Sequence, residues 1–213
     1  MMISSSDLWL CKQNPWYFLS NFFMTFDELD PLVPTRKPYP SHWTVFKDLL
    51  DRFESDLQLP GNRAIYVPKS RQLMVSWTVM GYLLNKCMYR DRTTCFVQSK
   101  RREDSEYQIE RIKKAYEYLV PELQALSPLS KSMERQPVAG LYFANGSSIQ
   151  ALPMGGDIIR SKVPTILFSD EAAFQDDFEE VIKAAKACTK LHISVSSPHP
   201  GTFQKIIEDT YGL

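Results

Sequence analysis

A short apolar run that ends in two acidic residues constrains this chain more than any other segment. Residues 166–168, Ile-Leu-Phe, are followed by Ser169 and then by Asp170 and Glu171. An apolar run without polar alternation is typical of a strand that is buried on both faces, as in a parallel sheet. The two carboxylates would then lie at the carboxyl end of that strand, which is where ligands bind in open α/β sheets.

The two carboxylates can take different parts in one reaction. Asp170 could hold a hydrated Mg²⁺, because Mg²⁺ prefers oxygen ligands and keeps several of its waters. Glu171, one residue further on, could accept a proton from an attacking water. The alternative is a solvated acidic turn that only ends a buried strand.

A strand followed by a loop and a helix recurs along most of the chain. Apolar runs predict strands over 64–67, 94–97, 166–168 and 191–195. Amphipathic patterns predict helices over 42–56, 76–89, 101–119, 177–188 and 202–209. Ser41 is the expected cap of the first helix, and Val45 belongs to its expected inner face. A hairpin is expected over 140–151, because Asn145-Gly146 suits a type I′ turn, and a loop is expected over 153–162. This alternation predicts an α/β domain with a mainly parallel central sheet flanked by helices.

The first 40 residues are dense in aromatic side chains and, near their end, in prolines. This composition predicts an irregular N-terminal arm over 1–40 that packs on the domain through its aromatics. Residues 41–213 would then form the domain itself. A groove for a partner is the alternative use of the same aromatic side chains.

The balance of charges narrows the classes of partner. Lys and Arg number 25, as do Asp and Glu, so no overall basic field favours nucleic acid. The four cysteines and three histidines match no zinc pattern, and scattered cysteines are typical of a reducing cytoplasm. We expect no signal peptide and no membrane span, because the sequence contains neither pattern.

A basic loop lies between the first predicted strand and the next helix. A strand, a loop and a helix that opens with a hydroxyl residue form the context of a phosphate-binding loop, where backbone N–H groups and the helix dipole hold the anion. Met74 and Val75 stand where the common pattern has glycine and lysine. Lys69 and Arg71 lie at the front of the loop instead, and Ser76 begins the helix. The alternative is a solvated basic loop in which Ser76 only caps the helix.

Three segments together resemble the ATPase domain of the large terminase subunit, the DNA-packaging motor of tailed bacteriophages. They are Pro-Lys-Ser-Arg-Gln-Leu-Met-Val-Ser-Trp at 68–77, Ile-Leu-Phe-Ser-Asp-Glu-Ala-Ala-Phe at 166–174 and Ser-Val-Ser-Ser-Pro at 194–198. The resemblance extends over roughly residues 38–205. It implies that 41–213 form a RecA-like P-loop NTPase domain of the ASCE type.

The resemblance implies a role for each residue of the basic loop. Lys69 would replace the usual phosphate-loop lysine, on the β- and γ-phosphates of ATP. Arg71 matches the arginine that senses or holds the γ-phosphate, and it could be the principal phosphate ligand in place of Lys69. Ser70 and Gln72 belong to the same phosphate-binding loop, and Ser76 would bind Mg²⁺.

The resemblance also implies roles for residues further along the chain. Asp170 looks like the Walker B aspartate, a metal ligand, and Glu171 like the catalytic glutamate. Ser196 and Ser197 match a motif that couples hydrolysis to DNA movement, with the end of a strand as the alternative. Arg160 would act as a finger on the ATP of a neighbouring subunit, with an ordinary surface arginine as the alternative; such fingers are worth about 10³-fold or more in related NTPases.

The activity implied by the resemblance is Mg²⁺-ATP hydrolysis coupled to the translocation of double-stranded DNA into a procapsid, in the cytoplasm of the infected bacterial host. The implied partners are the DNA, the portal protein, the small terminase subunit and further copies of the chain in a ring, with a monomer as the alternative in isolation. No nuclease activity is expected, because no cluster of acids follows Ser197. Adenine would stack on Trp43, Phe46 or Tyr39. DNA contacts would be independent of base sequence; the basic cluster at 100–102 is a candidate, with a solvated helix start as the alternative.

Two rival functions fit parts of the same pattern. A helicase-like ATPase core also uses an Asp-Glu strand, although it needs a second domain of the same type. A scaffold that no longer hydrolyses ATP is favoured by Met74 and Val75, because a side chain in the place of glycine could hold the loop too open for tight nucleotide binding.

Overall fold

The computed structural model of the chain describes residues 3–25, 37–40, 43–70, 73–130, 139–153 and 155–212. Its main sheet has six strands in the order β3-β8-β7-β4-β6-β5. The strands are β3 Arg63–Pro68, β4 Thr94–Gln98, β5 Gly140–Tyr142, β6 Ser148–Ala151, β7 Ile166–Asp170 and β8 Leu191–Ser196. All neighbours in this sheet are parallel except β5 and β6, which form the predicted hairpin. The predicted fold class, a mainly parallel sheet flanked by helices, is confirmed.

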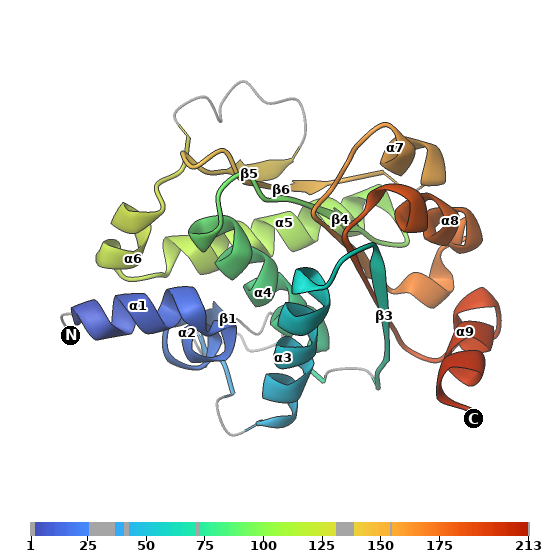
Figure 1. Ribbon diagram of the computed structural model, residues 1–213, viewed down its shortest axis with the longest axis horizontal. Helices are drawn as coiled ribbons and strands as arrows, with labels where there is room; N and C mark the ends of the chain where they lie inside the picture. The colour runs from blue at the N-terminus through green and yellow to red at the C-terminus, as the bar shows by residue number, and fades with distance from the viewer. Residues whose placement is uncertain are drawn as a thin grey trace.

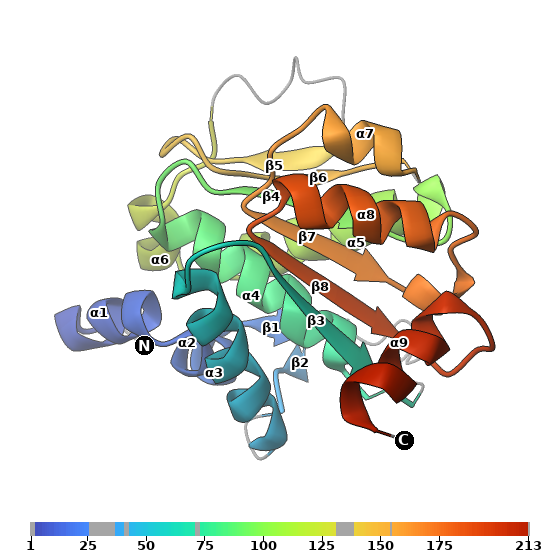
Figure 2. The ribbon, with the colours of Figure 1, turned by 45° about the vertical axis from the view of Figure 1, so that its right-hand side comes forward.

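Helices cover both faces of the sheet (Figure 2). On one face lie α3 Val45–Gln58, α4 Val75–Tyr89 and α5 Arg102–Glu117, with α6 Pro121–Leu126 beyond them. On the other face lie α7 Gly156–Arg160, α8 Phe178–Cys188 and α9 Thr202–Tyr211. The core follows the same division, because neighbouring residues of a strand point to opposite faces: Phe168 packs with the first group and Leu167 with the second. Every residue of β7 and of β8 is buried, as expected for central strands that are covered on both faces.

The N-terminal segment is helical where the sequence predicted irregular structure. Helices α1 Ser5–Gln13 and α2 Pro15–Phe22 occupy most of it (Figure 1). Their ends carry capping signals that outweigh the aromatic composition: Ser4 and Asp7 form a capping box, and the Asn14 side chain caps α2. The prediction of an irregular arm is therefore wrong for residues 5–22. A two-stranded sheet of β1 Met24–Thr25 and β2 Lys37–Pro38 follows.

The arm packs against the domain through apolar side chains, as predicted. Phe18 and Leu19 are fully buried in the same core as α4. A Cβ atom added at Gly81 of α4 would lie 2.9 Å from Leu19 Cγ, which leaves no room for a larger residue where α2 crosses α4. The absence of a side chain at Gly81 thus allows the close approach of these two helices.

Three further predictions need correction. Helix α3 begins at Val45, not at residue 42. Val45 was expected on the inner face but is 67% exposed, whereas Leu57, further along the helix, is buried. Ser41, the expected cap, lies outside the described residues. The long helix predicted to end at 119 ends at Glu117. The predicted loop 153–162 contains the short helix α7, whose five residues are too few to give an amphipathic pattern. None of the helices in the described residues has both the length and the apolar character that crossing a membrane requires.

Candidate active site

Acidic and basic side chains from three elements meet at the carboxyl edge of the sheet. Lys69 directly follows β3, Ser76 lies in the first turn of α4, and Asp170 ends β7 with Glu171 after it. They line a cavity of about 260 Å³. This volume is below the about 300–1,000 Å³ of pockets that enclose whole small molecules, so it suits the phosphate and metal part of a larger ligand.

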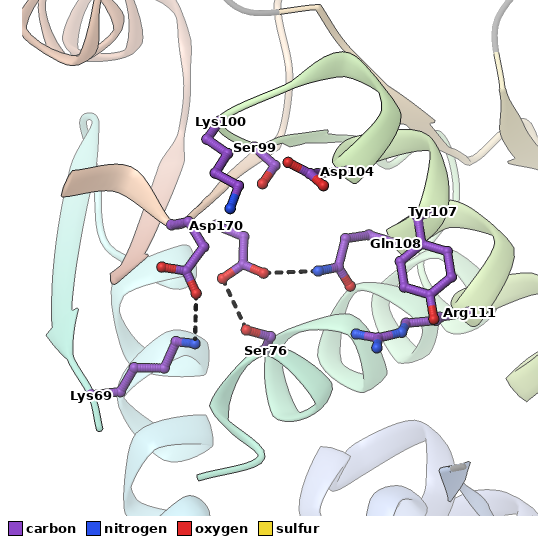
Figure 3. A pocket seen from close by; sticks show the side chains of 10 residues that line it. Lys69, Ser76, Ser99, Lys100, Asp104, Tyr107, Gln108, Arg111 and Asp170 are labelled. Carbon is purple, nitrogen blue, oxygen red and sulfur yellow. Dashed lines mark hydrogen bonds and ion pairs between the residues drawn. The ribbon is translucent and has the colours of Figure 1, made fainter. Parts of the chain in front are cut away.

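Asp170 is the most enclosed carboxylate of the site, at 3% exposure. Its Oδ1 atom accepts a hydrogen bond of 2.9 Å from Ser76 Oγ, and its Oδ2 atom accepts one of 2.8 Å from Gln108 Nε2 of α5 (Figure 3). A third bond of 3.0 Å runs from Gln175 Nε2 to the Asp170 carbonyl oxygen. The side chain and main chain of Asp170 are therefore held from three directions.

Burial governs the protonation of Asp170. Loss of solvent raises the pKa of the carboxyl above its ordinary value, while the charge of Lys69 and the hydroxyl of Ser76 offset part of this shift. Because the raised pKa favours the neutral form in the folded chain, this group makes folding more favourable as the pH falls through its folded pKa. A metal ligand must be ionised, so metal binding should weaken over the same pH range.

We expect the Asp170 carboxyl to titrate above the range of ordinary aspartates, and Ser76→Ala to raise its pKa further by removing a hydrogen bond to the ionised form. Carboxyl ¹³C chemical shifts followed against pH would measure both values. The exposed Ser161→Ala is a suitable control, because this hydroxyl bonds only a carbonyl of its own helix region. A lower pKa in Ser76→Ala would contradict the assigned hydrogen bond.

Glu171 forms an ion pair with Lys69, whose Nζ lies 3.3 Å from Glu171 Oε1. Lys69 is 10% exposed and Glu171 27%, so the pair is shielded although it borders the cavity. Glu171 has a left-handed backbone conformation, with φ of 50°. Such a conformation costs a residue with a side chain about 1–2 kcal/mol, and it occurs where the chain turns from β7 into the short helix Ala172–Phe174.

Met74 also has a left-handed conformation, with φ of 58° and ψ of 6°. This is the position at which the common phosphate loop has glycine, so the chain keeps a glycine-like backbone there without glycine. The turn lets α4 begin at Val75 with its N-terminus toward the cavity, where a helix dipole favours anions. Ser70 is exposed and does not line the cavity. Arg71 and Gln72, the other predicted loop residues, lie outside the described residues.

The side-chain oxygen atoms of Ser76 and Asp170 are suitable ligands for a magnesium ion. Mg²⁺ prefers oxygen ligands and keeps several of its waters, so a hydroxyl beside a carboxylate suits it. Ser76 Oγ and Asp170 Oδ1 are separated by 2.9 Å. Within the described part of the chain no group of three or more His, Cys, Asp or Glu side chains could hold a metal alone. The remaining ligands would therefore be water and phosphate, which Mg²⁺ favours.

Ser196 joins the two halves of the site. Its hydroxyl oxygen accepts a hydrogen bond of 3.1 Å from the Ala173 N–H, just after Glu171, and its carbonyl accepts one of 2.9 Å from the Lys69 N–H. Ser196 is fully buried and Ser197 is 8% exposed. A displacement at the end of β8 would therefore reach both Lys69 and the turn that carries Glu171.

A buried histidine couples β7 to β8 beneath the site. His192 Nε2 lies 2.9 Å from Ser169 Oγ and 3.0 Å from Ser194 Oγ. Burial lowers the pKa of His192 to about 3, so it is neutral at physiological pH. Its ring therefore adds no charge beside Asp170.

Arg160 is the one predicted catalytic residue that lies apart from this cluster. It ends α7, on the opposite face of the sheet from α4 and α5, and is not among the residues lining the cavity. Its guanidinium donates to Asp157 Oδ1 at 2.6 Å and to Glu180 Oε2 at 3.0 Å. Arg160 therefore does not contact the cavity of its own chain.

Helix α5 supplies a wall of the cavity that the sequence did not predict. Gln108 bonds Asp170, and Asp104, Tyr107 and Arg111 of α5 also line the cavity. Ser99 and Lys100, which lie between β4 and α5, line it as well. The Arg111 guanidinium lies 4.5 Å from the centroid of the Tyr107 ring and 5.3 Å from that of Trp77. No local motif marks these residues; only the spacing of 107, 108 and 111 on one side of a helix hints that they act together.

The three aromatics considered for adenine differ in accessibility. Tyr39 and Phe46 are 2% and 6% exposed and pack against each other, with ring centroids 6.0 Å apart. Trp43 is more accessible and packs against Phe46 at 5.7 Å. None of these three rings lines the cavity.

The order of the central strands identifies the fold. Strand β8 lies between β3, which leads into the basic loop, and β7, which carries the acidic pair. This strand order is that of the RecA-like fold.

The crystal structure of the HK97 bacteriophage large terminase shares this fold, with a TM-score of 0.60 at 17% sequence identity. The match covers 87% of this chain and 37% of the HK97 chain, so this chain spans little more than a third of that protein. The resemblance to large terminases seen in the sequence is thus confirmed at the level of the fold.

Weaker likenesses are found to the large terminase ATPase domain of Thermus phage P74-26 and to a mutant of it, with TM-scores of 0.46 and 0.48. Both are 12% identical to this chain, and each match covers 74% of this chain and 73% of the other. No family model and no curated protein matches the sequence.

Proposed function

We propose that this chain is the ATPase domain of a large terminase and couples Mg²⁺-ATP hydrolysis to the translocation of double-stranded DNA. One observation supports this above all others. Lys69, Ser76, Asp170 and Glu171 come from three separate elements and converge on one cavity at the carboxyl edge of a RecA-like sheet. Each offers the chemistry that its position in such a site requires.

The residues divide the work of phosphoryl transfer between them. Ser76 Oγ and Asp170 Oδ1 would hold Mg²⁺, which neutralises charge on the phosphates. Lys69 would bind the β- and γ-phosphates, together with Arg71 from the loop. Glu171 would orient the attacking water and accept its proton.

While Lys69 and Glu171 are paired, Lys69 is not available to bind phosphate and Glu171 is not available to activate water. An incoming phosphate competes with the Glu171 carboxylate for the Lys69 ammonium, 3.3 Å away. Once Lys69 turns to the phosphate, Glu171 loses its partner and becomes available to water. Binding of the nucleotide would therefore prepare the base for catalysis.

Coupling to DNA movement would pass through Ser196 and Ser197. The Ser196 hydroxyl is bonded to the main chain just after Glu171, so rearrangement around the cleaved phosphate can displace the end of β8. The segment beyond β8 leads into α9 on the outside of the domain. A displacement at the end of β8 would thus be transmitted from the site to α9 on the surface of the domain.

Arg160 would complete the site of a neighbouring copy in a homo-oligomeric ring. It is 47% exposed and held by two acids of its own chain, so it is presented at the surface and must exchange these partners for a phosphate. The portal protein, the small terminase subunit and sequence-independent contacts to DNA belong to the same proposal, as does action in the cytoplasm of the infected host.

The test is hydrolysis of ATP by the purified chain at increasing protein concentrations, with Mg²⁺ or with EDTA, and with or without double-stranded DNA. We expect hydrolysis that requires Mg²⁺ and rises more than linearly with protein concentration, because each site needs a neighbour. Absence of both nucleotide binding and hydrolysis would favour the scaffold alternative. Strand separation by the chain would favour a helicase.

A further inference from the structure

Gln108 of α5 lines the cavity beside Asp170, although no sequence motif marks it as a site residue. Gln108 Nε2 lies 2.8 Å from Asp170 Oδ2, across 62 residues of sequence. Only the amide NH₂ can donate to an ionised carboxylate, so the orientation of this amide is defined by chemistry. Gln108 is 8% exposed, which shields the bond from competing water.

The bond acts on the oxygen of Asp170 that Ser76 leaves unused. Ser76 contacts Oδ1 and Gln108 contacts Oδ2, so the two donors hold the carboxylate plane from opposite ends. Gln108 thereby prevents rotation of the carboxylate, and Oδ1 stays directed toward Ser76 (Figure 3). Partners of this kind orient metal ligands, and their loss typically costs about 10–100-fold in metal affinity.

The other end of the same amide points to a ligand. Within the described residues Gln108 Oε1 is buried and has no hydrogen-bond partner, although Gln108 lines the cavity. A buried acceptor without a donor is unfavourable, because it has lost its hydrogen bonds to water. Gln175 Oε1 also lacks a partner in that part of the chain, but Gln175 does not line the cavity, whereas Gln108 does. A water in the shell of a bound Mg²⁺ could supply the missing donor, since Mg²⁺ keeps several waters.

We propose that Gln108 is a positioning residue for the Mg²⁺ site, which it serves by orienting Asp170 through Nε2 and by accepting a hydrogen bond from a metal-bound water at Oε1. This inference rests on the proposed function and extends it to a residue of α5. It predicts that Gln108 affects the dependence of nucleotide binding on Mg²⁺, and leaves binding without the metal unchanged.

The test measures binding of the fluorescent nucleotide mant-ATP by the whole chain, titrated with Mg²⁺ and, separately, in EDTA. The main variant is Gln108→Met, which keeps length and apolar bulk but removes both polar atoms. Gln108→Asn keeps the amide but is one methylene shorter, so it should not reach Asp170. Gln204→Met is the matched control, because Gln204 also donates to a carboxylate, that of Glu208, on the exposed surface of α9.

In both Gln108 variants we expect the Mg²⁺ concentration for half-maximal enhancement of binding to rise about 10–100-fold. Binding in EDTA should match that of the unchanged chain, and Gln204→Met should match it under both conditions. Thermal unfolding monitors folding; if Gln108→Met fails to fold, Gln108→Asn carries the test. Wild-type dependence on Mg²⁺ in a folded Gln108 variant would overturn this inference alone. Failure of the unchanged chain to bind mant-ATP at all would overturn the proposed function and this inference with it.

Discussion

Glu171→Gln should abolish most ATP hydrolysis while the nucleotide still binds. Loss of a general base typically costs about 10²–10⁴-fold in rate. Glutamine keeps the size of the side chain but cannot accept a proton, so the reaction should stop at the bound nucleotide. The same change removes the negative partner of Lys69, which lies 3.3 Å from Glu171. Lys69 then has no competitor for phosphate, and mant-ATP should bind at least as tightly as to the unchanged chain.

Glu179→Gln is the matched control for this prediction. Glu179 lies on α8 with 66% of its side chain exposed, and it pairs with Lys183 on the surface. Surface pairs of this kind contribute little to stability, so hydrolysis and binding should stay near the values of the unchanged chain. Hydrolysis that survives Glu171→Gln would move the active site away from the end of β7. Loss of nucleotide binding in this variant would contradict the competition between Glu171 and phosphate for Lys69.

Arg160→Ala should reduce hydrolysis by about 10³-fold or more without preventing nucleotide binding. The expected reason is that Arg160 contributes charge to the ATP of a neighbouring copy and not to that of its own chain. In the isolated chain its guanidinium is occupied by Asp157 and Glu180. The effect should therefore be largest at protein concentrations where copies associate, and steady-state hydrolysis measured over a range of concentrations would show this.

Mixing two inactive variants separates action between copies from action within one. Arg160→Ala retains Glu171, and Glu171→Gln retains Arg160, so a mixture can form complete sites at interfaces where the two variants meet. We expect the mixture to recover part of the hydrolysis that each variant lacks alone. Lys183→Ala is the control, because Lys183 also pairs with Glu180 but has no expected role in hydrolysis. Failure of the mixture to recover activity, with Glu171→Gln and Arg160→Ala both folded and inactive, would contradict a finger that acts between copies.

The parts of the fold that were predicted well depend on local patterns. Residues 166–168 of β7 form an apolar run, and Leu191, Ile193 and Val195 make β8 apolar at alternate positions; both strands are central and buried on both faces. Asn145-Gly146 marked the hairpin of β5 and β6, but the expected type I′ turn was wrong, because only Gly146 of the two has a positive φ. The N-terminal arm also carries local helix signals, although its aromatic composition suggested irregular structure. Ser4 with Asp7, and Asn14 before Pro15, each mark the beginning of a helix.

The candidate site was partly predictable for the same reason. Sequence alone pointed to Lys69, Ser76, Asp170 and Glu171, since each is located by a strand end or a helix start, and parallel strands bring such ends to one edge. It could not indicate that Lys69 pairs with Glu171, because that contact spans 102 residues and depends on the order of the strands in the sheet.

The sequence by itself determined the central strands and the long helices of the domain and which charged residues stand at their ends, because these properties arise from interactions between near neighbours in the chain. Tertiary structure alone decided that Gln108 bonds Asp170, that Ser196 joins the turn after Glu171 to the start of the basic loop, and that Arg160 faces Glu180. These contacts depend on how helices cross the sheet and on which strands become neighbours. Packing of the whole chain sets both, and no single segment encodes them.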